Sequence, residues 1–314
     1  MSEQKLLETI AELKETYGLE VALFQTDGKL VASTAKDMSE VDNTIVQFVE
    51  KDLNRNIFIK DVLLGNLLAM DMHSKAKRLH IEAKPRVAYV IDTGKKSTDI
   101  VMELVKNLSN LKAGDFVTTV DEHSVVLVKD VSCYEITDYS KELELEKELE
   151  EIAMSLVDSL HMEAMVKVRV GYGNVVKEIA DIAQSFQEAK MALQVGKVFY
   201  AEKDTISYGR LGIGRLIYQL PMSLCDMFIK EVFGEKIPEI FEDEEIMSLI
   251  SKFFENNLNI SETARQLYVH RNTLVYRLER IEKEIGLDIR KFDDAMTFRI
   301  AVMVLAHVKN QRQQ

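Results

Sequence analysis

Residues 246–287, IMSLISKFFENNLNISETARQLYVHRNTLVYRLERIEKEIGL, decide the fold of the C-terminal part of this chain. Between Ile246 and Phe254, apolar residues recur at i, i+3, i+4, i+7 and i+8, which is the spacing of one apolar helix face. Asn256 and Asn257 predict the end of this helix, because asparagine tolerates the left-handed conformation in which many helices end. The stretch therefore begins with an amphipathic helix.

A short helix, a turn and a longer helix are predicted next. Ser261 is expected to N-cap the short helix, which runs to Leu267, because its hydroxyl can bond an unpaired N–H of the first turn. Residues 268–270 make the turn, and the longer helix runs from Arg271 until Gly286 ends it in the left-handed conformation. The apolar face of the longer helix is formed by Leu274, Leu278, Ile281 and Ile285. This order of elements is the helix-turn-helix plan.

The opposite face of the longer helix carries the side chains that DNA recognition needs. Arginine binds phosphates or guanine edges, and Asn and Thr bond base edges or backbone oxygens. Residues 265–281 contain four arginines and a single acid, Glu279, so this segment is positively charged although the whole chain has a formal charge of −12. The residues expected to contact DNA are His270, Arg271, Asn272, Thr273, Tyr276, Arg277 and Arg280. The alternative is a helical hairpin with a solvated charged face, because arginine is a good helix former.

Several strings in this region resemble the C-terminal helix-turn-helix of the CdaR/PucR family, bacterial transcription regulators of sugar-diacid and purine use. They are NISETAR at 259–265, VHRNTL at 269–274, YRL at 276–278 and GLD at 286–288. The core at 270–281, HRNTLVYRLERI, is specific. The resemblance implies that these residues lie on a DNA-reading helix, without saying which base each one reads.

The composition bounds the class of protein. A chain of 314 residues predicts two or three domains. Cys133 and Cys225 are the two cysteines of the sequence and show no disulfide or CxxC metal pattern, which fits a reducing cytoplasm. Residues 1–18 lack the apolar region of a signal peptide, and no apolar run approaches the ~20 residues of a membrane span. We expect a cytoplasmic protein without a cofactor, a metal site or a membrane partner.

The front of the chain is expected to be a small α+β unit over residues 1–56. A helix over 6–18, apolar runs at 19–25 and 30–33, and a helix over 41–53 make up the unit, and Asp27-Gly28 predicts a hairpin between the two runs. This unit is a candidate sensor, and a dimerisation appendage without a ligand is the alternative. Residues 57–83 are expected to form one long connecting helix.

The middle of the chain alternates strands and helices. Strands are expected at 86–92, 115–120, 124–130, 165–171 and 206–208, and helices at 97–111, 139–161 and 175–195. This order resembles the nucleotide-cyclase-like GGDEF layout. The strings KPRVAYVID at 84–92, VRVGYGNVVKEI at 168–179 and AKMALQVGK at 189–197 resemble the middle domain of the CdaR family.

An active cyclase is disfavoured by the tip of the predicted hairpin. A GGDEF signature there supplies glycines that let a nucleotide approach the backbone and acids that hold a metal. Residues 119–123 read TVDEH, so the two glycines are missing, and Asp121 and Glu122 are interpreted as ordinary turn residues. We therefore predict no enzyme.

These observations together predict an α+β multidomain protein: a small α+β unit at 1–56, a connector helix and a GGDEF-like α/β domain at 57–211, and an all-α domain at 212–314 with its helix-turn-helix at about 243–287. Its predicted function is sequence-specific DNA binding as a transcriptional regulator that responds to a small metabolite. Operator DNA, an unidentified effector and a second copy in a homodimer or higher homo-oligomer are the expected partners. A nucleotide cyclase-like enzyme with a DNA-binding tail, and a metabolite-binding adaptor that has lost DNA binding, are the alternatives.

Overall fold

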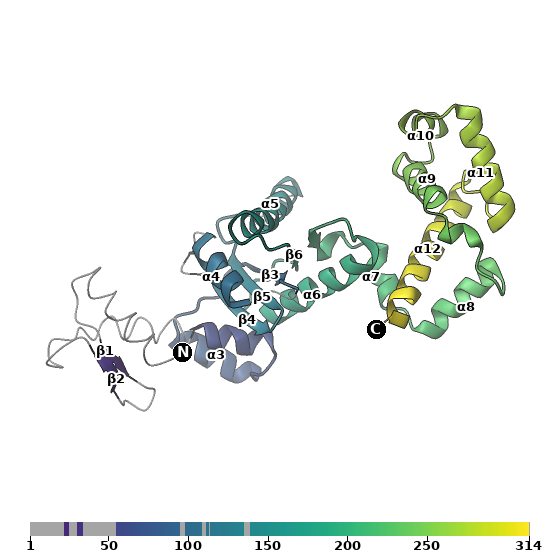
Figure 1. Cartoon of the computed structure of the whole chain (residues 1–314). Coiled ribbons are helices and arrows are strands. Elements are labelled where there is room, and N and C mark those ends of the chain that lie inside the picture. Colours follow the sequence, from purple (N-terminus) through teal and green to yellow (C-terminus); the bar gives the residue numbers. More distant parts are fainter. Residues whose placement is uncertain are drawn as a thin grey trace. The chain divides into compact units, whose positions relative to one another are not determined.

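The computed structural model describes residues 22–24, 30–33, 55–94, 98–108, 111–112, 114–134 and 139–313 (Figure 1). It divides the chain into two compact units, residues 1–190 and 191–314, and each is described by itself below. The helices expected at 6–18 and 41–53 lie outside the described residues. None of the described helices has the length and apolar character required to cross a membrane.

A five-stranded sheet with the order β4-β5-β3-β6-β7 organises the middle of the chain. Strand β3 (Arg86–Asp92) pairs antiparallel with β5 (Ser124–Asp130) on one side and with β6 (Arg169–Tyr172) on the other. Strand β4 (Phe116–Asp121) forms a hairpin with β5, and β7 (Thr205–Ser207) lies beyond β6. Because β3 has a neighbour on each side, all its residues are buried except the half-buried Asp92.

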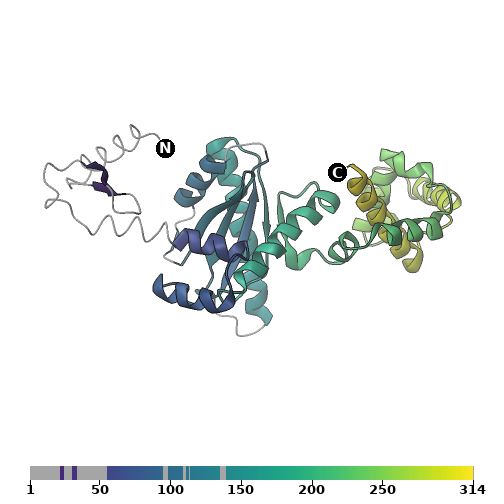
Figure 2. The ribbon, with the colours of Figure 1, turned by 90° about the horizontal axis from the view of Figure 1, so that it is seen from below.

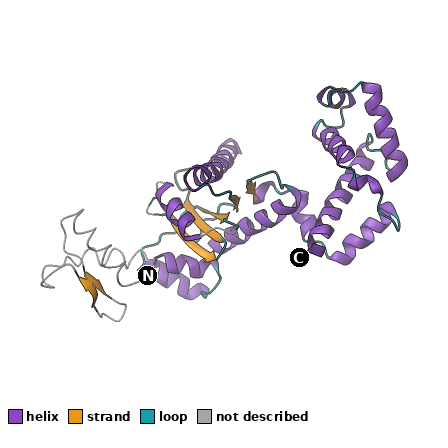
Figure 3. Ribbon diagram, in the orientation of Figure 1, coloured by secondary structure: helices purple, strands orange, loops and turns teal. Residues whose placement is uncertain are grey.

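Helices α4 (Thr98–Leu108) and α5 (Tyr139–Ala164) share an apolar core with one face of this sheet. The core is centred on Tyr89 of β3, whose ring lies 5.4 Å from the ring of Tyr172 and whose hydroxyl donates to the carbonyl of Leu149 at 3.2 Å. Burial raises the pKa of Tyr89 well above its usual value, so this hydroxyl stays protonated. Figure 3 shows the strands of this unit in orange with helices around them.

The predicted order of elements in the middle domain is confirmed: β3, α4, β4, β5, α5, β6, α6 (Ile182–Phe199) and β7 follow one another. The hairpin expected near the N-terminus is also present, with β1 (Ala22–Phe24) antiparallel to β2 (Leu30–Ser33). A mixed fold, with a GGDEF-like α/β middle domain and an all-α C-terminal domain, therefore matches the expected class (Figure 2).

The long connecting helix predicted at 57–83 is wrong. A helix covers residues 55–63, and α3 (Ala69–Arg78) is a separate one. Gly65 breaks the two apart, because its φ of +70° is left-handed and glycine adopts that conformation without a steric penalty. Apolar spacing alone did not reveal this break.

The last helix of the middle domain begins later than predicted. Val176 exchanges two backbone hydrogen bonds of 2.8 Å with Arg86 at the start of β3, so the chain cannot turn helical there, and α6 begins at Ile182. Gly173 is needed just before this bridge, because a Cβ at that position would lie 2.1 Å from the carbonyl oxygen of Ser185. The strand expected to start at Met165 starts at Arg169 instead, since α5 continues to Ala164.

After β7 the second unit is helical. Its helices are α7 (Ile213–Tyr218), α8 (Met222–Phe233), α9 (Glu244–Glu255), α10 (Ile260–Gln266), α11 (Arg271–Ile285) and α12 (Phe292–Gln313). Helix α7 was not predicted. Helix α12 joins two apolar clusters: Phe298 packs with the cores of α9 and α11, whereas Ala301, Val304 and Leu305 pack with α8. Helix α12 therefore contributes apolar residues to both cores of the unit, from more than one of its sides.

Candidate nucleic-acid interface

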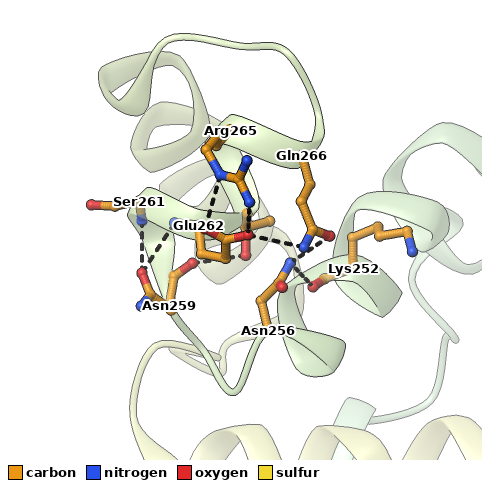
Figure 4. Close-up of polar contacts among 8 residues, drawn as sticks. Lys252, Asn256, Asn259, Ser261, Glu262, Arg265 and Gln266 are labelled. Atoms are coloured by element: carbon orange, nitrogen blue, oxygen red, sulfur yellow. Dashed lines mark hydrogen bonds and ion pairs between the residues drawn. The ribbon is translucent and has the colours of Figure 1, made fainter.

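The start of α10 is fixed by Asn259, so the predicted N-cap at Ser261 is wrong. The Asn259 Oδ1 accepts hydrogen bonds from the backbone N–H groups of Ser261 and Glu262, both at 3.1 Å (Figure 4). The carbonyl of Asn259 also accepts from Oγ1 of the fully buried Thr263 at 2.8 Å. Asn259 and Ser261 are both residue types that make good N-caps, and the burial of Thr263 favours the register in which Asn259 is the cap.

A chain of polar contacts ties α10 to the end of α9. Asn256, which ends α9, donates from Nδ2 to the carbonyl of Lys252 at 2.9 Å and to Oε1 of Gln266 at 3.1 Å (Figure 4). Gln266 in turn donates to Glu262, which also accepts two hydrogen bonds from Arg265 at 3.0 and 2.6 Å. The hydrogen bond from Arg265 lowers the pKa of Glu262, so the pair stays charged. The hydrogen bond from Asn256 to Gln266 thus connects the end of α9 to α10.

The turn between α10 and α11 determines where α11 begins. Tyr268 has a left-handed φ of +56°, and the next N–H, that of Val269, donates to the carbonyl of Ala264 at 3.0 Å. His270 is the N-cap of α11, because its Nδ1 accepts a hydrogen bond of 3.2 Å from the backbone N–H of Asn272. His270 therefore has a structural role that the sequence did not indicate, besides its expected place at the interface.

The buried side of α11 agrees with the predicted spacing. Its buried apolar residues are Leu274, Leu278, Ile281 and Ile285. They lie in one core with Phe253 of α9, Ala264 of α10 and Phe298 of α12. The helix ends at Gly286, whose φ of +76° is the predicted left-handed conformation.

Six of the seven residues expected to contact DNA are exposed, at the start of α11 or on its solvent side. They are His270, Arg271, Asn272, Thr273, Tyr276 and Arg280. Tyr276 is 70% exposed, and a large aromatic side chain standing in water on this face is available for contact with a ligand. In the described part of the chain, neither Arg271 nor Arg280 forms an ion pair. The face thus presents cations and amide or hydroxyl groups to solvent.

Arg277 differs from the other expected contact residues because it is half-buried and paired. Its Nη1 donates to Oε1 of Glu245 at 2.8 Å. Glu245 lies in the first turn of α9, which is N-capped by Asp243. Sequence reasoning missed this partner, because the two residues are 32 positions apart and belong to different helices.

A second feature absent from the sequence prediction is a clamp at the far end of α11. Arg290 contacts Asp288 through Nε at 2.6 Å and Glu282 of α11 through Nη2 at 2.5 Å. Asp288 also accepts from the backbone N–H of Arg290, and the hydrogen bonds from Arg290 lower the pKa of Asp288. The clamp fixes the loop between α11 and α12, and the neighbouring GLD string at 286–288 is the signal that could have indicated it.

At the tip of the β4–β5 hairpin in the middle domain, Asp121 has a structural role. Asp121 pairs with Ser124 across the β4–β5 hairpin, and its Oδ1 accepts from the backbone N–H of His123 at 2.9 Å. Asp121 therefore shapes the turn, which agrees with its interpretation as an ordinary turn residue.

Comparison with known proteins agrees with this architecture. The model of the PucR C-terminal helix-turn-helix domain matches residues 247–304, which run from α9 into α12. The model of the GGDEF-like domain matches residues 65–195. The chain thus carries a GGDEF-like domain followed by a PucR-type helix-turn-helix domain, and its resemblance to the CdaR/PucR family is confirmed.

Regulatory proteins are among its relatives. The chain is 30% identical to the purine catabolism regulatory protein of Bacillus subtilis (strain 168) over 43% of this chain and 25% of that protein. It is 24% identical to the carbohydrate diacid regulator of Escherichia coli (strain K12) over 88% of this chain and 72% of that protein. The DNA-binding transcriptional activator AdeR of Bacillus subtilis (strain 168) is 23% identical over 50% of this chain and 38% of that protein. The similarity thus spans a quarter of the length of the first of these relatives.

Proposed function

We propose that this chain is a sequence-specific DNA-binding transcriptional regulator. The observation that carries the proposal is the surface of α11: Arg271, Asn272, Thr273 and Tyr276 are exposed, whereas one side of the helix is apolar and buried, in a helix-turn-helix with a matching family model. The first turn of a recognition helix usually enters the major groove, where Asn272 and Thr273 can reach base edges. The names of the relatives support the same function.

Selection of DNA by the full-length protein tests this proposal. A pool of random duplexes is incubated with the protein, and the bound duplexes are amplified and sequenced over several rounds. We expect enrichment of a short motif, because Asn and Arg side chains discriminate base edges. Recovery of a pool with no sequence preference would contradict the proposal.

We propose further that the regulator acts as a homodimer. One recognition helix covers only a few base pairs, and a chain with a formal charge of −12 repels DNA except where its cations are placed locally. Two copies would double the contacts, with half-sites about 34 Å apart or at a multiple of that distance. The selected motif is then an inverted or direct repeat.

A response to a small metabolite completes the proposed function. The first unit has a cavity of about 420 Å³, lined by Arg55, Lys106 and Lys112 among others, and this size suits a small molecule. Its lining acid Asp115 is already bound to Lys129 at 2.6 Å. The names of two relatives refer to different metabolites, purines and carbohydrate diacids.

The middle domain is proposed to lack nucleotide cyclase activity. Its hairpin tip has no glycine that would let a nucleotide approach the backbone, and Asp121 is engaged in the turn. Purified protein incubated with GTP and Mg²⁺ should therefore release no cyclic product, as measured by chromatography. Cyclic product that disappears in the Asp121→Ala and Glu122→Ala variants would instead support the enzyme alternative.

A further inference from the structure

We propose that Glu245 holds Arg277 in position to read a base, so that these two residues form one specificity-determining pair. The inference rests on the proposed function, because it assigns roles within the same DNA interface. Arg277 is the residue that touches DNA in this account, and Glu245 is its positioning residue.

The pair joins two separately fixed helices. Nη1 of Arg277 donates to Oε1 of Glu245 at 2.8 Å. The first turn of α9 is held by Asp243, whose Oδ1 accepts from the backbone N–H groups of Glu245 and Ile246 at 3.0 and 3.1 Å. The next turns of α9 are buried through Leu249, Ile250 and Phe253. The backbone at Glu245 is therefore held by the cap and by the buried part of α9, which is what a positioning carboxylate requires.

The arginines of this interface differ in how they are held. Arg277 is paired across helices, whereas Arg271 and Arg280 form no ion pair within the described residues. An unpaired, mobile guanidinium suits phosphates, which accept a cation in many geometries. A guanine edge instead requires a guanidinium in one fixed orientation, since its O6 and N7 are read by two parallel N–H groups. The pairing therefore marks Arg277 as the base-reading arginine.

The pair retains the capacity to bind a base. A guanidinium has five N–H donors, and the contact with Glu245 uses one of them. The two side chains are 41% and 75% exposed, so in water the ion pair contributes little to the free energy of unfolding. At a DNA interface, exclusion of water strengthens the same contact. The pair is thus expected to act mainly in the complex.

The chain offers a matched control for testing this pair. Glu244 is the exposed neighbour of Glu245 in the first turn of α9 and forms no ion pair in the described structure. Glu244→Ala and Glu245→Ala remove the same charge from the same turn, so both should strengthen binding to any duplex alike. Alanine is chosen because the amide oxygen of glutamine could still accept the hydrogen bond from Arg277. A difference between the two variants in sequence discrimination reports the contact with Arg277.

The experiment measures the affinity of the full-length protein for its selected duplex and for a scrambled duplex. We expect Glu245→Ala to lower the ratio of the two affinities about tenfold, as Arg277→Ala does, which is the size of one lost bidentate contact. Glu244→Ala should leave the ratio unchanged. The double variant Glu245→Ala/Arg277→Ala should lose no more discrimination than Arg277→Ala alone, because the two residues act as one unit.

Three other outcomes would overturn the inference. An unchanged ratio in Glu245→Ala, with or without a lower Tm, would make the contact merely structural. An increased ratio would mean that Glu245 competes with DNA for Arg277. In both cases the parent still prefers its selected duplex, so the proposed function stands. A parent that shows no preference would overturn the proposed function and the pair with it.

Discussion

Leu278→Ala is expected to lower the free energy of unfolding of the C-terminal unit by ~2–5 kcal/mol. Leu278 is 1% exposed and lies in the core where α9, α10, α11 and α12 meet. Truncating it leaves a cavity in this core, which also contains Leu274, Ile281 and Phe298, and the lost contacts are not replaced. Denaturant unfolding of the full-length protein, followed by circular dichroism, measures the change.

Tyr276→Ala is the matched control for this variant. Tyr276 lies on the same helix two residues earlier, but it is 70% exposed, so its truncation should change the free energy of unfolding by no more than about 0.5 kcal/mol. If Leu278→Ala were as stable as Tyr276→Ala, α11 would not be anchored through the face described here.

The second large effect is expected from the double variant Arg271→Ala/Arg280→Ala, which should bind every duplex more weakly. Both arginines are exposed and form no ion pair in the described part of the chain, so they are available to phosphates. Two lost charge-assisted contacts of about 1.5 kcal/mol each correspond to roughly a hundredfold lower affinity. The slope of log affinity against log salt concentration should fall by about two per bound chain.

A charge removed elsewhere should not have this effect. Lys309 is an exposed cation of α12 and lies outside α11. Lys309→Ala should therefore keep the salt slope of the parent in fluorescence anisotropy titrations at several salt concentrations. Equal salt slopes for the parent and the double variant would show that these arginines do not contact the DNA backbone.

The parts of the fold that depend on local spacing could be predicted from the sequence. The apolar face of α11 follows from a period of 3.6 residues, and Gly286 ends the helix because few other residues accept a φ of +76°. The β4–β5 hairpin and the order of elements in the middle domain also follow from local patterns.

The parts that depend on contacts distant in sequence could not be predicted. Asn259 and Ser261 are both good N-caps, and the choice between them is made by packing around Thr263. The late start of α6 results from the bridge between Val176 and Arg86, which are 90 residues apart in the chain and unrelated by any periodicity. The contact between Arg277 and Glu245 could not be predicted for the same reason, because the two residues are 32 positions apart in the sequence.

The central claim is that α11 reads DNA sequence, and Asn272→Ala tests it most directly. Asn272 is exposed, and its backbone N–H rather than its side chain takes part in the cap of α11, so the variant should fold like the parent. The measurement is the affinity of parent and variant for the selected and the scrambled duplex. We predict that Asn272→Ala lowers affinity for the selected duplex by ~1–3 kcal/mol and leaves that for the scrambled duplex nearly unchanged. Equal loss on both duplexes, or no loss on either, would contradict the account.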